Sequence, residues 1–145
     1  MTTTQTKNRG FTLVELLIVI VIIAILTVVS LVAYNGLQNR AKTTAAASAA
    51  ETVAKKAEIY NTESSGYPKD LKTLMKASSD KSYSIGTDVL TAKSEGLTDL
   101  ASKPDEANTI AYEACTDNKG ARIFYWDYGT NKKQTRTVGT CPATP

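Results

Sequence analysis

An uninterrupted apolar run near the N-terminus constrains this chain more than any other feature of its sequence. The 18 residues from Leu16 to Ala33 carry no charge, and the run reaches 23 residues when it is counted from Phe11. As a helix, such a run rises about 35 Å, which exceeds the roughly 30 Å hydrocarbon core of a bilayer. A soluble amphipathic helix would show a polar face at 3.6-residue spacing, and this run has none. The sequence therefore predicts a transmembrane helix over residues 11–33.

Basic residues stand directly before the apolar run. With Lys7 and Arg9 on that side, the positive-inside tendency keeps the N-terminus in the cytoplasm and sends the rest of the chain outward. A secretory signal would have a shorter apolar region and a small-x-small cleavage site, but here Leu31 stands where a small residue is needed. Without Lys7 and Arg9 the chain has 15 basic and 14 acidic residues, so its formal charge of +3 does not argue for nucleic-acid binding.

Glu15 is the only charged residue within the apolar run. A carboxylate inside a membrane helix costs on the order of 2.5–3.5 kcal/mol on insertion scales, so it needs a partner or a use. Two interpretations are open from the residues alone. Glu15 either reaches the nearby cytoplasmic interface, or it pairs with an opposite charge inside the membrane.

Residues 10–16, Gly-Phe-Thr-Leu-Val-Glu-Leu, resemble the processing site of type IV prepilins and pseudopilins, a class III signal peptide. In that family a short basic leader ends in glycine, the mature chain begins with a phenylalanine, and its fifth residue is a glutamate. Here those positions are Gly10, Phe11 and Glu15. The resemblance rests on several coinciding features: leader length, glycine, phenylalanine, glutamate spacing and the apolar run.

The resemblance implies how the chain is processed and assembled. A prepilin peptidase would remove the leader, residues 1–10, by cutting after Gly10, and Phe11 would then be N-methylated. Cleavage exposes a charged amine at Phe11 in an apolar setting, where an unpaired charge is costly. In the family, the residue equivalent to Glu15 pairs with this amine on a neighbouring subunit, which sets the register of the filament.

The implied partners and locations follow from the same resemblance. The chain would be a single-pass protein of the cytoplasmic membrane, N-terminus in and head outside, in contact with lipid before assembly. It would then join a helical homo-oligomeric filament at the cell surface, together with other pilins or minor pilins. The prepilin peptidase and an inner-membrane assembly platform would act on it, and DNA is a further candidate partner. No cofactor is implied.

The resemblance also implies an α+β fold, with a long N-terminal helix packed against a small antiparallel sheet. Beyond the membrane segment, residues 34–62 form an amphipathic pattern with an alanine-rich middle, so one helix over about 11–62 is expected. Many pilins carry a helix-weakening glycine and proline in the first half. This chain has Ala24 and Val32 at those places, which predicts an unbroken helix.

Residues 63–145 are predicted to form the globular head. Gly66 is expected just past the end of the long helix, and Pro68 is expected to open a short helix with Asp70 in its first turn. A similar Gly-Tyr-Pro pattern recurs at this place in many pilins. The segment 78–105 is predicted to be a connecting region with one short strand near residues 83–85.

Three strands follow, over residues 108–115, 121–128 and 133–139. The turns between them are placed at 117–120 and 129–131, where Asn, Asp and Gly gather. The sequence thus predicts a three-stranded antiparallel meander that packs on the long helix. Because this head is only about 80 residues, packing on the helix and a cross-link would both help to stabilise it.

Cys115 and Cys141 are the only cysteines, and both lie outside the membrane in this topology, where disulfides persist. A disulfide between them is predicted, and a C-terminal disulfide loop also occurs in many pilins. Two free thiols are the alternative. A metal site is not expected from two thiols in a chain without histidine.

A catalytic function is not predicted, since no nucleophile lies in a recognisable motif and no phosphate-binding loop is present. DNA binding is a rival function because basic residues lie among aromatic ones near the last two strands. The basic set is Lys119, Arg122, Lys132, Lys133 and Arg136. The favoured interpretation is different: the aromatic residues Phe124, Trp126 and Tyr128 face the helix, and the basic residues only solubilise the rim.

Two further alternatives remain open from the sequence. The chain could be a membrane-anchored domain that keeps its leader and never polymerises. It could also be a minor pilin or pseudopilin of a type II secretion or competence system, with a head that binds DNA or another ligand. The motif is common to these classes, so adhesion, twitching motility, secretion and DNA uptake are not distinguished.

Overall fold

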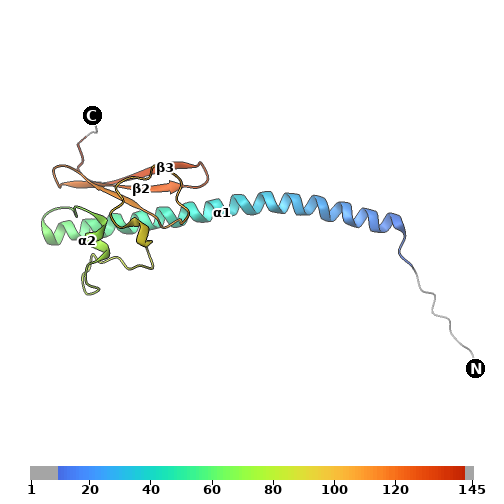
Figure 1. Ribbon diagram of the computed structural model, residues 1–145, viewed down its shortest axis with the longest axis horizontal. Coiled ribbons are helices and arrows are strands. Elements are labelled where there is room, and N and C mark those ends of the chain that lie inside the picture. The colour runs from blue at the N-terminus through green and yellow to red at the C-terminus, as the bar shows by residue number, and fades with distance from the viewer. Residues whose placement is uncertain (1–9, 143–145) are drawn as a thin grey trace, which may run out of the picture. The chain divides into compact units, whose positions relative to one another are not determined.

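The computed structural model describes residues 10–142, so most of the predicted leader, including Lys7 and Arg9, lies outside the described residues. The elements are α1 (Leu13–Ser64), α2 (Leu71–Met75), a 3-10 helix η1 (Ala92–Ser94), β1 (Ala111–Ala114), β2 (Gly120–Asp127) and β3 (Lys132–Gly139) (Figure 1). The chain divides into two compact units, one ending at Leu37 and the other beginning at Gln38. A long apolar helix followed by a small antiparallel sheet confirms the predicted α+β, type IV pilin-like fold.

The unbroken helix α1 agrees with the expectation from Ala24 and Val32. Its end differs in detail from the prediction. Ser65, not Gly66, takes the left-handed conformation past the last turn, with a φ of 57°. Gly66 instead lies against the turn between β1 and β2: a Cβ there would lie 2.5 Å from Nδ2 of Asn118, so a larger residue would displace this side chain. The amide of Tyr67 donates to the Asn118 carbonyl at 3.1 Å, so this junction fixes the helix end against the sheet.

The second half of α1 forms one wall of the core. Its buried residues recur at spacings of three and four, which places them on one face of the helix. They are Ala46, Ala49, Ala50, Val53, Ala54 and Ala57. Because five of the six are alanines, the helix backbone can approach the strands closely, and larger side chains from the sheet and from α2 fill the space around them.

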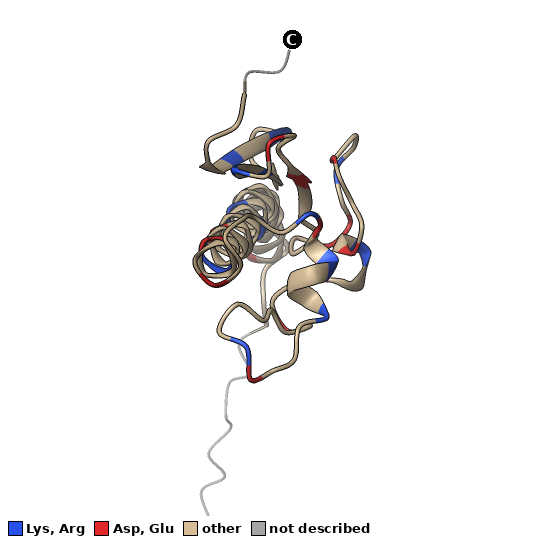
Figure 2. Ribbon diagram, turned by 90° about the vertical axis from the view of Figure 1, so that its left-hand side faces the viewer, with Lys and Arg blue, Asp and Glu red and all other residues tan. Residues whose placement is uncertain are grey.

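The sheet has the order β1-β2-β3, with both pairs antiparallel. In the register, Tyr112 lies opposite Ile123 and Val138 opposite Ala121, and all four belong to the core cluster that contains residues 49–57 of α1. Figure 2 shows this sheet beside the helix and the connecting loops on another side of it. The predicted meander is therefore present and packs on α1.

Phe124 and Trp126 are buried, but not where the sequence interpretation placed them. They project to the opposite face of β2 from Ile123. There they group with Leu100 and Ala111, and the partly buried Leu97 and Ala107 pack against them, whereas Ala46 is the only member that α1 contributes. Because successive side chains of β2 point to opposite faces, Phe124 and Trp126 form a second face of the sheet, and the connecting region covers it.

The strand bounds differ from the prediction by a few residues, and tertiary bonds hold the backbone at two of these ends. The Ile110 amide donates to Oγ of Ser94 at 2.9 Å, on the side of the chain away from β2, which ties the residue before β1 to the η1 region. The Tyr128 amide donates to Oγ1 of Thr43 on α1 at 2.9 Å, directly after β2 ends at Asp127.

Two predictions for the head are corrected. Asp70 is the N-cap of α2, where its carboxylate accepts from the Thr73 amide at 2.8 Å, so the helix begins after Asp70 instead of at Pro68. Residues 83–85 do not form a strand. The Ile85 amide makes a bond to the Leu74 carbonyl at 3.0 Å, and the buried Ile85 side chain anchors the segment without a sheet partner.

Candidate processing and assembly site

The predicted cleavage junction lies at the start of the described chain. Gly10 and Phe11 precede α1 and are exposed, with 86% of the Phe11 surface accessible. A Cβ placed on Gly10 would meet nothing within 4 Å. The peptide bond between the two residues thus lies outside the helix and between two exposed residues.

Thr12 and Glu15 form a capping box at the N-terminus of α1. Oε2 of Glu15 accepts from the Thr12 amide and from the Thr12 hydroxyl, each at 2.8 Å. In return, the Glu15 amide donates to Oγ1 of Thr12 at 3.2 Å. Two backbone amides that the helix cannot satisfy itself gain acceptors in this way.

Thr12 is a site residue that the sequence analysis did not single out, although a signal for it exists. Thr-x-x-Glu directly before an apolar run is the sequence pattern of a capping box. The contact gives Glu15 a local partner before any second subunit is present. It also occupies only Oε2: among residues 10–142, no group bonds to Oε1, which leaves this atom able to accept from an additional donor.

The first unit presents apolar surface without cover. All of the large hydrophobic side chains from Phe11 to Leu37 are exposed, between about half and nine-tenths of their surface. In the described part of the chain, α1 alone is long and apolar enough to cross a membrane. Such a surface is stable in lipid or against other apolar helices and not in water.

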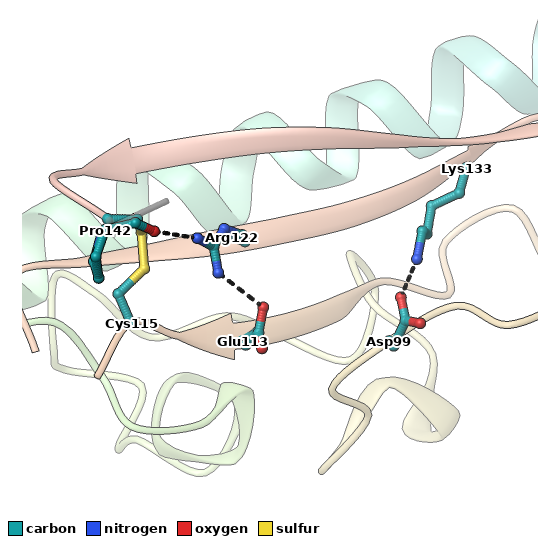
Figure 3. Close-up of polar contacts among 7 residues, drawn as sticks. Asp99, Glu113, Cys115, Arg122, Lys133 and Pro142 are labelled. Atoms are coloured by element: carbon teal, nitrogen blue, oxygen red, sulfur yellow. Dashed lines mark hydrogen bonds and ion pairs between the residues drawn. A yellow bond between two sulfur atoms is a disulfide. The ribbon is translucent and has the colours of Figure 1, made fainter. Parts of the chain in front are cut away.

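The two cysteines form the predicted disulfide bond, Cys115–Cys141, with 5.4 Å between their Cα atoms. Arg122 lies beside it, shown in Figure 3, and donates to the Pro142 carbonyl at 2.6 Å and to Glu113 at 3.4 Å. The disulfide and this arginine together hold the C-terminal segment to the end of β1 and to the start of β2.

The five basic residues of the DNA interpretation are not brought together. Arg136 forms an ion pair with Glu51 on α1 at 3.3 Å, while Arg122 and Lys133 point to the other face of the sheet. Lys133 binds Asp99 at 2.5 Å, also shown in Figure 3. Lys119 and Lys132 lie at opposite ends of β2, near its first and last residues. DNA contact by this set stays a prediction, and three of the five cations already have carboxylate partners.

Two ionisable side chains in the head, those of Tyr112 and Asp127, make hydrogen bonds that hold the fold together. The Tyr112 side chain is buried, which raises its pKa, and its hydroxyl donates to the Pro68 carbonyl at 2.9 Å. The pKa of Asp127 is lowered mainly by hydrogen bonds from the Thr130 hydroxyl and amide. Within residues 10–142, no three His, Cys, Asp or Glu side chains gather in a way that could hold a metal ion.

Comparison with known proteins agrees with this geometry. Residues 5–31 match the model of the prokaryotic N-terminal methylation motif, the class III signal peptide of type IV pilins. No curated protein and no solved structure matches the chain. The match covers the processing junction, Thr12, Glu15 and most of the apolar run, and it points to a structural protein anchored in a membrane. With this motif ahead of a long apolar helix and a three-stranded head, the chain combines the N-terminal methylation motif with a type IV pilin-like fold.

Proposed function

We propose that this chain is a prepilin that is cleaved between Gly10 and Phe11, methylated on the new N-terminal amine, and polymerised into a surface filament through α1. The observation that supports this most is the uncovered apolar surface of residues 11–37, next to an accessible cleavage junction. Lipid covers this surface before assembly, and the same surfaces of neighbouring copies cover it in the filament.

Cleavage changes the charge at the start of α1. Hydrolysis of the Gly10–Phe11 bond leaves the carboxylate on Gly10 and a protonated amine on Phe11, at the positive end of the helix dipole. An unpaired cation there would be costly in an apolar filament core. Glu15 supplies the opposite charge to the amine of an adjacent subunit. Its Oε1 atom makes the ion pair while Thr12 holds Oε2.

The head is proposed to lie outside the cell. The basic residues before the apolar run favour an N-terminus in the cytoplasm, and a disulfide in the head suits an oxidising compartment. Prepilin peptidase and the assembly platform would act at the cytoplasmic membrane. Other pilins, including minor pilins, would be the partners within the filament.

The test is the mass of the native protein and of its N-terminal peptide, in membrane and sheared-filament fractions. We expect a chain that begins at Phe11 and carries one additional methyl group. Its abundance in sheared filaments would distinguish a major pilin from a minor pilin or pseudopilin. A chain that keeps residues 1–10 and stays in the membrane would instead identify an anchored domain that does not polymerise.

A further inference from the structure

Cys141 is held on both sides by bonds that do not involve its sulfur. On one side, the Thr140 amide donates to the Lys119 carbonyl at 2.9 Å, in the turn before β2. On the other side, Nη2 of Arg122 donates to the Pro142 carbonyl at 2.6 Å. The backbone around Cys141 is therefore fixed by its neighbours as well as by the disulfide.

Cys115, the other half of the disulfide, is fixed in the same way. Its amide donates to the Gly120 carbonyl at 2.9 Å, and its carbonyl accepts from the Asn118 amide at 2.9 Å, which closes the turn between β1 and β2. Cys115 is 6% exposed, whereas Cys141 is partly exposed. Because none of these bonds depends on the sulfur–sulfur bond, the folded head can make them while both cysteines are still thiols.

Arg122 is the side chain that reaches the segment beyond Cys141. It lies on β2 opposite Glu113 of β1, and its Nη1 atom is 3.4 Å from Oε2 of Glu113. Only 19% of the Arg122 side chain is exposed, so this ion pair is partly shielded from water. The guanidinium is a planar fork: one nitrogen binds the carboxylate while the other donates to the Pro142 carbonyl, as Figure 3 shows.

We propose that Arg122 is a positioning residue for disulfide formation, which holds Pro142 and with it Cys141 within reach of Cys115 before the sulfur–sulfur bond forms. The proposal concerns the head alone and does not rest on cleavage or polymerisation. It assigns to Arg122 a role in a covalent step, beyond the stability that its bonds give to the finished fold.

The step needs an external disulfide as the oxidant. The more exposed Cys141, as its thiolate, attacks that disulfide, which forms a mixed disulfide and releases one thiol. The Cys115 thiolate then attacks the Cys141 sulfur, forms the Cys115–Cys141 bond and expels the second thiol. Two electrons and two protons thus pass from the cysteines to the oxidant. Arg122 acts on the second attack, because that step depends on how often the two sulfurs meet.

The test follows both attacks in the full chain. The reduced, folded protein in detergent is mixed with oxidised glutathione, and samples are quenched by alkylation, so that their masses distinguish the dithiol, the mixed disulfide and the closed form. We expect Arg122→Gln to slow closure roughly fivefold or more and to leave formation of the mixed disulfide unchanged. Arg122→Lys keeps the charge without the fork and should close at an intermediate rate.

Arg136→Gln is the matched control. It removes an arginine with a carboxylate partner, Glu51, from the neighbouring strand β3 and should change neither rate. Unchanged closure in Arg122→Gln would overturn the proposal, and so would equal slowing in Arg136→Gln.

A second measurement separates positioning from a general loosening of the head. In a Cys141→Ser chain, Cys115 is the one remaining thiol, and its alkylation rate reports how accessible it is. This rate should be the same with and without Arg122→Gln, because β1 and the following turn hold Cys115. Faster alkylation in the double variant would mean that Arg122 only stabilises the fold, which would also overturn the proposal. Filament formation is tested separately, by the N-terminal mass.

Discussion

Thr12 and Glu15 satisfy each other at the start of α1: the Thr12 amide and hydroxyl both donate to Oε2 of Glu15, and Thr12 accepts from the Glu15 amide. A charge that looks unpaired in the sequence thus has a local partner in the single subunit. This contact lowers the cost of keeping the carboxylate near the membrane while Oε1 is left for a second donor. The carboxylate that caps α1 is thus the one that we propose to pair with the Phe11 amine of a neighbouring subunit.

Replacing Thr12 tests the capping box. Thr12→Val removes the hydroxyl and should destabilise the first helical turn by about 1 kcal/mol, which is the usual value of an N-cap. Hydrogen exchange of the amides of residues 13–15 in nanodiscs should then become faster. Thr12→Ser keeps the hydroxyl and serves as the matched control. Equal exchange in the two variants would mean that the capping box does not hold the helix start.

Replacing Glu15 separates processing from assembly. Glu15→Val leaves the Gly10–Phe11 junction intact, so removal of residues 1–10 should continue. The Phe11 amine would then have no partner in the filament core, and sheared filaments should be lost. Glu15→Asp keeps the charge on a shorter side chain and should give an intermediate yield. Normal filaments from Glu15→Val would contradict the proposed ion pair.

Local patterns predicted the elements of this fold well. The apolar run and the alanine-rich stretch predicted α1 to within two residues at each end, since both signals lie within one segment: the length of the uncharged run in the first half, and helix propensity with three- and four-residue spacing in the second. The strands were also found, because β-branched and aromatic residues are bounded by clear turn signals. Asn118 and Asn131, each with a φ of 56°, occupy the turns that those signals indicated.

What could not be predicted depends on contacts between segments distant in sequence. The alternation along β2 shows that Phe124 and Ile123 face opposite ways, but not which face meets α1. The loop that covers Phe124 and Trp126 decides this, and it carries no periodic signal. The bonds of Thr43 to Asp127 and Tyr128 are likewise tertiary and have no local pattern.

The disulfide should contribute substantially to the stability of the small head. Cys115 and Cys141 are 26 residues apart in sequence, and closing a loop of this size is worth about 3–4 kcal/mol in the chain-entropy model. Thermal unfolding of the oxidised protein should shift to lower temperature after reduction. Cys115→Ser should show the lower midpoint with and without reductant. A midpoint that reductant leaves unchanged in the native chain would argue against this contribution.

Two leucines distinguish the core of the head from the exposed surface of α1. Leu74, on α2, is completely buried in the core, and Leu74→Ala should cost about 2–5 kcal/mol of unfolding free energy. Leu37→Ala removes the same atoms from a residue that is 66% exposed, so it should leave the unfolding of the head nearly unchanged. Chemical denaturation followed by Trp126 fluorescence measures both. Similar losses for the two variants would mean that the assigned core is wrong.

Asp127 should make the head sensitive to acid. Hydrogen bonds from Thr130 and Gly129, and one from Thr43 at 3.1 Å, favour its charged form and lower its pKa in the folded state. Since the folded pKa lies below the unfolded one, the stabilisation is complete above the unfolded value of about 3.9 and is lost as the pH falls through the folded pKa. Asp127→Asn cannot titrate and keeps one oxygen acceptor. The denaturant midpoint of the native chain should therefore fall more between pH 7 and pH 3 than that of Asp127→Asn, whereas parallel curves would show that this carboxylate does not couple folding to pH.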